Sequence, residues 1–186
     1  MELEIWLLRH GSTKFSVDGR YCGQRDEPLS ARGRREVLAR RSEIADLPYE
    51  HLWSSDLQRC VETARIVAGE PMLDERLREF DFGEIEGKRF DDLDDKIQKG
   101  LLLFDGFVAP GGEAVDTFRD RVAGFFAGLT HGRHLVVTHG GVIRLLMREQ
   151  GSDLRIDPGG LVHLSTTRSE GWKPQLTITE SVGHGD

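Results

Sequence analysis

Two short apolar runs, far apart in the chain, each end abruptly in a polar turn that contains a histidine. Residues 5–8 (IWLL) lead into residues 9–13 (RHGST), and residues 135–137 (LVV) lead into residues 138–141 (THGG). Uninterrupted apolar runs of this kind are typical of strands buried on both faces, as in parallel sheets. Because the carboxyl ends of such strands meet at one edge of the sheet, the two histidines are expected to lie close together, where ligands bind in open α/β sheets.

The rest of the chain alternates between strand-like and helix-like patterns. We expect further strands near 52–53 and 71–73, and helices over 30–47, 56–68, 113–129 and 141–150. Residues 161–165 and 172–179 alternate like two more strands, whereas residues 79–112 read as a long irregular segment with one helix near 91–99. This order predicts an α/β fold, a three-layer sandwich with a mostly parallel central sheet and helices on both faces. The length of 186 residues fits one domain over 1–186.

Local signals refine two of the helices. Ser30 is expected to cap the helix over 30–47, and Ser55 or Asp56 the helix that runs to Ala68, with Gly69 closing it. The second of these helices carries an apolar stripe that should pack on the sheet. The stripe consists of Leu57, Cys60, Val61, Ala64 and Val67.

Composition excludes several classes of function. A net charge of −7 argues against broad nucleic-acid binding, which needs a basic surface. No apolar run approaches the ~18 residues of a membrane span, and the acidic start does not resemble a secretory leader. Two cysteines, Cys22 and Cys60, are too few for a disulfide framework. We therefore expect a cytoplasmic protein that binds neither membrane nor nucleic acid.

Cationic groups follow three of the strands and predict an anion site. Arg9 and His10 follow the first strand, Arg59 lies in the first turn of the helix after residues 52–53, and His139 precedes a Gly-Gly helix start. Helix N-termini at the same edge add free backbone N–H groups. Such a pocket suits a tetrahedral dianion, most naturally a phosphate.

Histidine can also be a covalent nucleophile. Attack by neutral His10 on phosphorus would give a phosphohistidine, while Arg9, Arg59 and His139 neutralise the transferring group. This scheme needs no metal and no cofactor. Glu79 lies beside two phenylalanines in residues 77–83 (LREFDFG), a setting in which a carboxyl group is more easily kept protonated. We predict it as the acid that protonates the leaving oxygen.

Taken together, the motifs resemble those of the histidine phosphatase superfamily, in its phosphoglycerate-mutase-like branch. Residues 8–13 look like its signature, residues 55–64 (SDLQRCVETA) its second arginine motif, residues 77–87 its acid-bearing segment, and residues 138–141 its second histidine. The resemblance implies His10 as nucleophile, Glu79 as proton donor, and Arg9, Arg59 and His139 around the phosphate.

The chain departs from the family pattern at three positions. Ser16 stands where many relatives carry Asn, and Cys22 where some carry Gln. A serine hydroxyl can still donate one hydrogen bond, so Ser16 is included among the phosphate contacts, whereas a thiol is a poor donor. Ile85 replaces a Trp that is common in relatives, which would reshape the leaving-group side.

Within the family, residues 110–113 (PGGE) followed by an amphipathic helix resemble the α-ribazole phosphatases of cobalamin synthesis. The resemblance implies hydrolysis of a small phosphorylated metabolite, α-ribazole 5'-phosphate being one candidate, by a monomer or a homodimer. A cofactor-dependent phosphoglycerate mutase and a broad-specificity sugar phosphatase are the enzyme alternatives. A non-catalytic phospholigand-binding module is the non-enzyme alternative, although such a module needs neither a nucleophile nor an acid.

Other residues have a structural interpretation. We expect His51 and His163 in the core, and we expect no metal site at His131 and His134, because a loop-to-strand position does not hold two ligands on one face. Four phenylalanines of the irregular region are candidates for the core, or in part for the mouth of the substrate site. They are Phe80, Phe82, Phe104 and Phe107.

Overall fold

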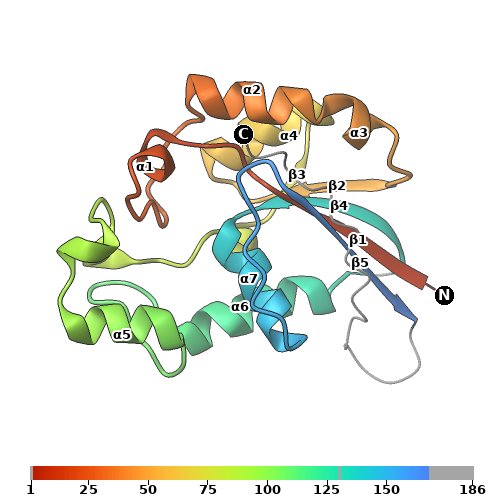
Figure 1. Cartoon of the computed structure of the whole chain (residues 1–186). Coiled ribbons are helices and arrows are strands. Elements are labelled where there is room, and N and C mark those ends of the chain that lie inside the picture. Colours follow the sequence, from red (N-terminus) through yellow and green to blue (C-terminus); the bar gives the residue numbers. More distant parts are fainter. Residues whose placement is uncertain (1, 130, 168–186) are drawn as a thin grey trace.

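The computed structural model describes residues 2–129 and 131–167, and the centre of this part is a five-stranded sheet (Figure 1). The strands are β1 (Glu2–Arg9), β2 (His51–Ser54), β3 (Met72–Leu73), β4 (Gly132–Thr138) and β5 (Leu161–Thr167). Their order is β3-β2-β4-β1-β5, with β5 antiparallel to β1 and every other pairing parallel. The α/β fold and the mostly parallel sheet are therefore confirmed.

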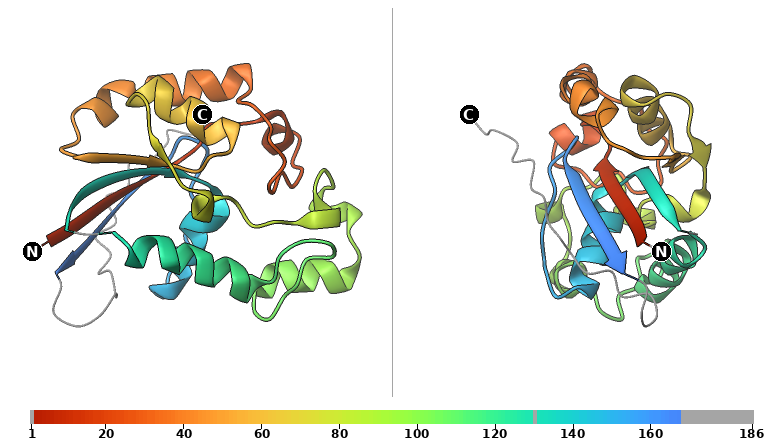
Figure 2. Two further views of the ribbon diagram at one scale, coloured as in Figure 1. Left: turned by 180° about the vertical axis from the view of Figure 1, so that it is seen from behind. Right: turned by 90° about the vertical axis from the view of Figure 1, so that its right-hand side faces the viewer.

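Helices cover both faces of the sheet, as Figures 1 and 2 show. On one face lie α2 (Ala31–Ala39), α3 (Arg41–Ala45) and α4 (Gln58–Val67). On the other face lie α6 (Val115–Ala127) and α7 (Gly140–Glu149), with α5 (Asp95–Leu103) beyond them. The short α1 (Lys14–Val17) and the 3-10 turns Glu75–Leu77, Gly83–Ile85 and Phe90–Asp92 belong to the connections.

Side chains of β1 point alternately to the two faces of the sheet, which explains why two hydrophobic cores form. Ile5 and Leu7 pack with α6 and α7, whereas Trp6 and Leu8 pack with α2 and α4. Leu7 and Leu8 are both fully buried, and burial of one such side chain stabilises the fold by about 1.5–3 kcal/mol. Strand β1 is thus held from both sides, which fixes the position of its carboxyl end.

The register of β1 against β4 places the two predicted histidines together. Arg9 is the partner of Thr138 in this parallel pair, so the next residues along each strand, His10 and His139, leave the sheet side by side. The glycine after His10 allows a close approach to α2, because a Cβ atom at Gly11 would lie 2.5 Å from the Gly33 carbonyl oxygen. Two glycines therefore let the turn after β1 rest directly on a helix backbone.

The helix predicted over 30–47 is wrong in one respect, because it is divided into α2 and α3. Ser30 caps α2 as expected, its hydroxyl accepting the Gly33 N–H. The Arg40 N–H then bonds to the Val37 carbonyl, three residues back, and this tighter turn ends α2. Val37 and Ile44 stay buried on the same core, so the apolar spacing carries no sign of the break.

The predicted cap of α4 is also wrong. The residue before the helix is Leu57, and the N–H of Gln58 bonds to the carboxylate of Asp26, far away in the sequence. Ser55 instead faces His139, and Asp56 forms an ion pair with Arg78. The helix ends at Val67, one residue before the predicted end.

Several smaller expectations can be compared directly. The helix expected near 91–99 is α5, which begins at Asp95 after an Asp94 cap. His51 is exposed rather than in the core and stacks on His134, with ring centroids 4.9 Å apart. His163 is partly buried and stacks on Trp6. The predicted strand over 172–179 lies outside the described residues.

Within residues 2–129 and 131–167, none of the helices combines the length and the apolar character needed to cross a lipid bilayer.

Candidate active site

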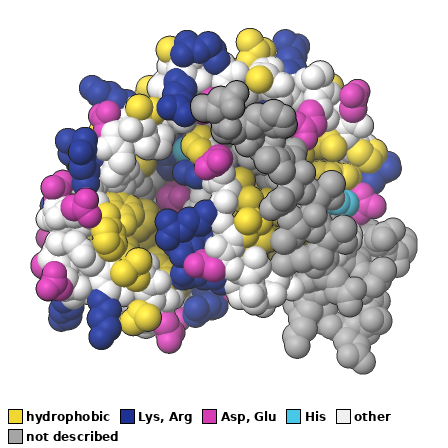
Figure 3. All heavy atoms as spheres, viewed as in Figure 1, with side chains coloured by type: hydrophobic (Ala, Val, Ile, Leu, Met, Phe, Trp, Pro, Cys, Tyr) yellow, Lys and Arg dark blue, Asp and Glu magenta, His cyan; other side chains and the backbone are white. Residues whose placement is uncertain are grey.

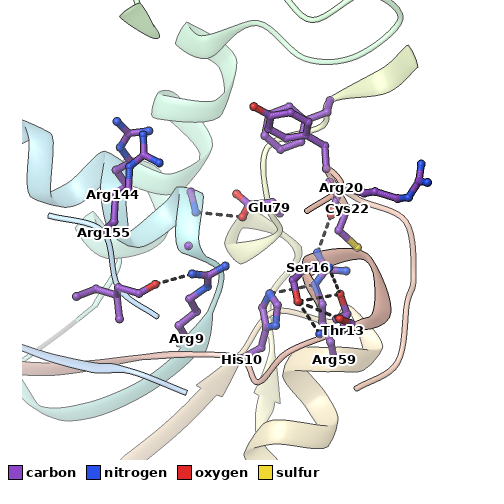
Figure 4. Close-up of a pocket in the computed structure, with 16 residues that line it drawn as sticks. Arg9, His10, Thr13, Ser16, Arg20, Cys22, Arg59, Glu79, Arg144 and Arg155 are labelled. Atoms are coloured by element: carbon purple, nitrogen blue, oxygen red, sulfur yellow. Dashed lines mark hydrogen bonds between the residues drawn. The ribbon is translucent and has the colours of Figure 1, made fainter. Parts of the chain in front are cut away.

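A cavity of about 260 Å³ lies at the carboxyl ends of β1 and β4 (Figure 4). Arg9 and His10 enter it from the end of β1, and Gly140 and Gly141 from the start of α7. The remaining walls come from the α1 region and the loop after it, from Arg59 of α4, from the segment around Glu79, from Arg144 of α7 and from residues 155–156. Figure 4 shows Arg9, His10 and Glu79 around the same open space, although 69 positions separate the last two in the sequence.

The orientation of His10 is set by its own neighbour. Its Nδ1 lies 2.7 Å from the Gly11 carbonyl oxygen, and its side chain is only 5% exposed. A carbonyl oxygen can only accept, so Nδ1 carries the proton and Nε2 keeps its lone pair. A nucleophilic histidine needs such an unprotonated nitrogen, and Arg59 Nε lies 3.3 Å from Nε2.

Arg59 connects the histidines to the loop that closes the cavity. Its Nε–H points to both His10 Nε2 and His139 Nδ1, each at 3.3 Å. Its two terminal nitrogens donate to the carbonyl oxygens of Gly23 and Arg25, at 2.6 and 2.8 Å. The guanidinium is fully buried, so it presents a fixed positive charge beside the nucleophile.

His139 is hydrogen-bonded to Arg59 and is fully buried. Since the Arg59 Nε–H donates to Nδ1 of His139, the proton of this ring is on Nε2, which lies 2.9 Å from Ser55 Oγ. The His10 and His139 ring centroids are 5.1 Å apart, as the strand register requires. His139, however, is not among the described residues that line the cavity. A direct contact between His139 and phosphate stays a prediction, and the geometry shows a ring that holds Arg59 in place.

Arg9 offers an unused donor. One terminal nitrogen bonds to the Ile156 carbonyl, while the buried Nε has no hydrogen-bond partner among the described residues. Burial lowers the pKa of Arg9, and the nearby Glu79 opposes that shift. A buried guanidinium N–H without a partner is costly, and an anion in the cavity would satisfy it.

Glu79 is held over the cavity by backbone donors. Its two carboxylate oxygens accept the N–H groups of Phe80 and Gly141, at 2.9 and 3.0 Å. A Cβ atom at Gly141 would lie 2.0 Å from Glu79 Oε1, so only glycine permits this approach. The glycine pair after His139, read in the sequence as a helix start, therefore also makes room for the predicted acid.

Of the three positions that depart from the family pattern, Ser16 and Cys22 line the cavity, whereas Ile85 is buried in the core. Ser16 Oγ accepts the Thr13 N–H and donates to the Thr13 carbonyl, closing the capping box of α1. Burial raises the pKa of the Cys22 thiol to about 11, so it stays protonated near neutral pH. The role of Ser16 as a phosphate contact stays a prediction.

Sequence reasoning missed the cationic rim of the cavity. Arg20, Arg144 and Arg155 line it, and Figure 4 shows the last two on the side opposite Arg20. Arg144 is bound to Asp153 by two hydrogen bonds, and Arg20 donates to the Gly87 carbonyl. Arg20 and Arg155 are exposed and lie outside the helices and strands, and Arg144 lies partly buried on α7. The only available signal was positive charge in a chain of net charge −7.

A metal centre was not expected from the sequence. Within the described ranges there is no group of three or more His, Cys, Asp or Glu side chains arranged to hold a metal ion. His134 is buried, and its Nδ1 lies 3.2 Å from the indole nitrogen of Trp53.

The protonation state of His10 gives a testable pH dependence. Burial, then Arg59 and Arg9, lower its pKa well below the ordinary 6.5. A lowered pKa means that His10 stays neutral as the pH falls past 6.5 and gains its proton only at a lower pH. In ¹⁵N NMR spectra of the free protein, Nε2 of His10 should keep the shift of an unprotonated nitrogen at pH 6. A midpoint at or above pH 6.5 would contradict this electrostatic interpretation.

The comparisons with known proteins agree with the geometry. The profile of the histidine phosphatase superfamily (branch 1) matches residues 5–175. The chain is 34% identical over 151 residues to "Probable phosphoglycerate mutase GpmB" of Salmonella choleraesuis (strain SC-B67), covering 74% of this chain and 70% of that one.

Solved structures show the same fold over nearly the whole chain. A phosphoglycerate mutase from Thermus thermophilus is 35% identical with a TM-score of 0.86, covering 97% of this chain and all of that one (100%). The protein "putative alpha-ribazole-5'-P phosphatase" from Escherichia coli K-12 is 26% identical with a TM-score of 0.82, covering 99% and 98%. The match of the family profile, together with these relatives, shows that the chain belongs to the histidine phosphatase superfamily, branch 1.

Proposed function

We propose that this protein is a metal-independent phosphomonoesterase that hydrolyses a small phosphorylated metabolite through a phosphohistidine. The observation that carries the proposal is the hydrogen bond from His10 Nδ1 to the Gly11 carbonyl, which leaves Nε2 unprotonated beside Arg59. A module that only binds phosphate has no need of a histidine in this tautomer.

In the first step, the Nε2 lone pair of His10 attacks phosphorus and the bond to the leaving oxygen breaks. Arg59 and the free N–H of Arg9 neutralise charge on the transferring phosphoryl group. Glu79 supplies the proton that the leaving alkoxide takes up. In the second step, water attacks phosphorus, its proton returns to Glu79 and the bond to Nε2 breaks, which restores the enzyme.

Two features favour α-ribazole 5'-phosphate as the first substrate to try. One is the 26% identity to the E. coli protein, and the other is the sequence of residues 110–113. The runner-up is a phosphoglycerate mutase, which the 34% identity to the Salmonella protein supports. A mutase would use the same phosphohistidine but return the phosphoryl group to a phosphoglycerate instead of to water.

A substrate panel with a chelator tests the proposal. Phosphate release should be measured with α-ribazole 5'-phosphate, sugar phosphates, nucleotides and 3-phosphoglycerate, each with and without excess EDTA. We expect hydrolysis that EDTA leaves unchanged, because arginines stabilise the charge.

A loss of activity that only a divalent ion restores would contradict the metal-independent mechanism. The mutase would be supported instead if the protein, primed with 2,3-bisphosphoglycerate, formed 2-phosphoglycerate from 3-phosphoglycerate faster than it released phosphate.

A further inference from the structure

A second cavity, which we call the annex, adjoins the active site. It holds about 100 Å³, and it shares Tyr21, Phe82, Gly141 and Arg144 with the phosphate cavity. These shared residues form the boundary between the two. The position of Gly141 places the annex on the leaving-group side, because the N–H of this residue bonds to Glu79, the predicted acid.

Aromatic side chains form the largest group in the walls of the annex. Phe80 lies between Phe82 and Phe104, with ring centroids 5.0 and 5.1 Å away and both pairs edge-to-face. Leu101 and Leu145 complete the apolar lining. In Figure 3, hydrophobic side chains gather on the left of the face shown, over the chain between α1 and α5, beside a group of Lys and Arg side chains. Phe82 thus lines the cavity that holds His10, and Phe80 and Phe104 line the annex, while their place at a substrate mouth stays a prediction.

One wall residue is held in an uncommon backbone conformation. Phe104 ends α5 with φ of 50°, the one positive φ among the described non-glycine residues. An aromatic residue in the left-handed region is strained, and such residues persist where the surroundings fix them, often at ligand sites. Glycine would adopt this conformation without strain, whereas phenylalanine adds its ring to the lining of the annex.

From these contacts we infer that the leaving group of the substrate carries a planar ring, which occupies the annex while the phosphate lies on His10. The inference rests on the proposed function and names its substrate class. A cavity of this order takes up about one six-membered ring. Aromatic walls favour a ring through edge-to-face contacts, and Arg144 and Arg148 add two cationic side chains to the lining, which suit the face of a ring.

Esters of similar leaving-group basicity test the inference. Ethyl, hexyl and 2-phenylethyl phosphate are all esters of primary alcohols, so differences in kcat/KM report contacts of the group beyond the reacting oxygen. We expect 2-phenylethyl phosphate to exceed ethyl phosphate by roughly 10–100-fold, the value of burying one ring. It should also exceed hexyl phosphate. Equal values for the phenyl and hexyl esters would overturn the assignment to a planar ring.

Matched variants locate the effect. Phe104→Gly removes the wall ring and suits the left-handed turn, so the ratio of kcat/KM for the phenyl ester to kcat/KM for the ethyl ester should fall to within a few-fold of unity. Phe107→Leu is the control, because Phe107 belongs to the same aromatic cluster but, in the described structure, lines neither cavity. An undiminished preference in Phe104→Gly, with thermal unfolding unchanged, would contradict the inference.

A binding measurement separates failure of the inference from failure of the proposed function. If no ester releases phosphate, the proposed hydrolysis is wrong. The annex is then judged by calorimetry with 3-phenylpropylphosphonate and propylphosphonate, which copy the phenyl and ethyl esters without a cleavable bond. The phenyl compound should bind roughly 10–100-fold more tightly, and Phe104→Gly should remove the difference. Equal dissociation constants in the wild type would overturn the inference.

Discussion

Replacing His10 by Ala should abolish turnover and the phosphoenzyme together. With substrate labelled at phosphorus and quenched rapidly in base, the wild type should carry a label that acid removes, as expected of a phosphohistidine. The variant should carry none, and kcat should fall by roughly 10⁴–10⁶-fold, as when a nucleophile is lost in other enzymes. The reason is the tautomer of His10, whose Nε2 lone pair lies in the cavity beside Arg59.

His163→Gln is the matched control, because His163 is partly buried and stacks on Trp6, on a strand away from the cavity. It should keep both label and activity. Stable labelling of His10→Ala at another histidine would assign the nucleophile elsewhere, His139 being the first position to inspect.

Replacing Glu79 by Gln should affect poor leaving groups more than good ones. An alkoxide needs its proton in the transition state, whereas nitrophenolate departs largely without one. The variant should lose roughly 10²–10⁴-fold on an alkyl phosphate and clearly less on nitrophenyl phosphate. The measurement is kcat/KM for both esters, with wild type and variant at one pH. Equal losses would mean that Glu79 only positions the phosphate or holds the loop.

Neighbouring carboxylates serve as controls for Glu79. Glu84 is exposed, and Glu86 accepts the Gln24 N–H, so neither occupies the place over the nucleophile. Glu84→Gln and Glu86→Gln should show smaller effects that do not depend on the leaving group. If Glu84→Gln gave the leaving-group-dependent loss, the acid would have to be reassigned to that residue.

The sequence predicted what depends on periodic burial and on turns at strand ends. The runs 5–8 and 135–137 are buried on both faces, and their register brings His10 and His139 within 5.1 Å, measured between ring centroids. Those positions follow from the strand pattern alone, because a parallel pair leaves the sheet at one edge. The alternation of strands and helices was legible for the same reason.

What the sequence could not show depends on contacts between distant residues. The cap of α4 comes from Asp26, and Ser55 and Asp56, which look like caps, are engaged by His139 and Arg78. A capping rule based on the local sequence favours the nearest polar side chain, and it does not include competing partners that are distant in the sequence. The annex is another example, since Tyr21, Phe104 and Leu145 meet only in the folded chain.

The hydrogen bond between His10 and the Gly11 carbonyl has a consequence for the course of both displacements. The hydrogen bond involves Nδ1, so phosphorylation of Nε2 leaves the bond intact. The imidazole ring therefore keeps its orientation between the two steps. The phosphoryl group would then face the same side of the cavity when it leaves as when it arrived. Water and the alcohol product would then compete for the same position beside the phosphoryl group. The outcome would depend on how long the alcohol stays bound before water replaces it. A phosphatase and a mutase would then differ in the residues that set how long the alcohol product stays bound, and not in the catalytic residues that act on the phosphoryl group.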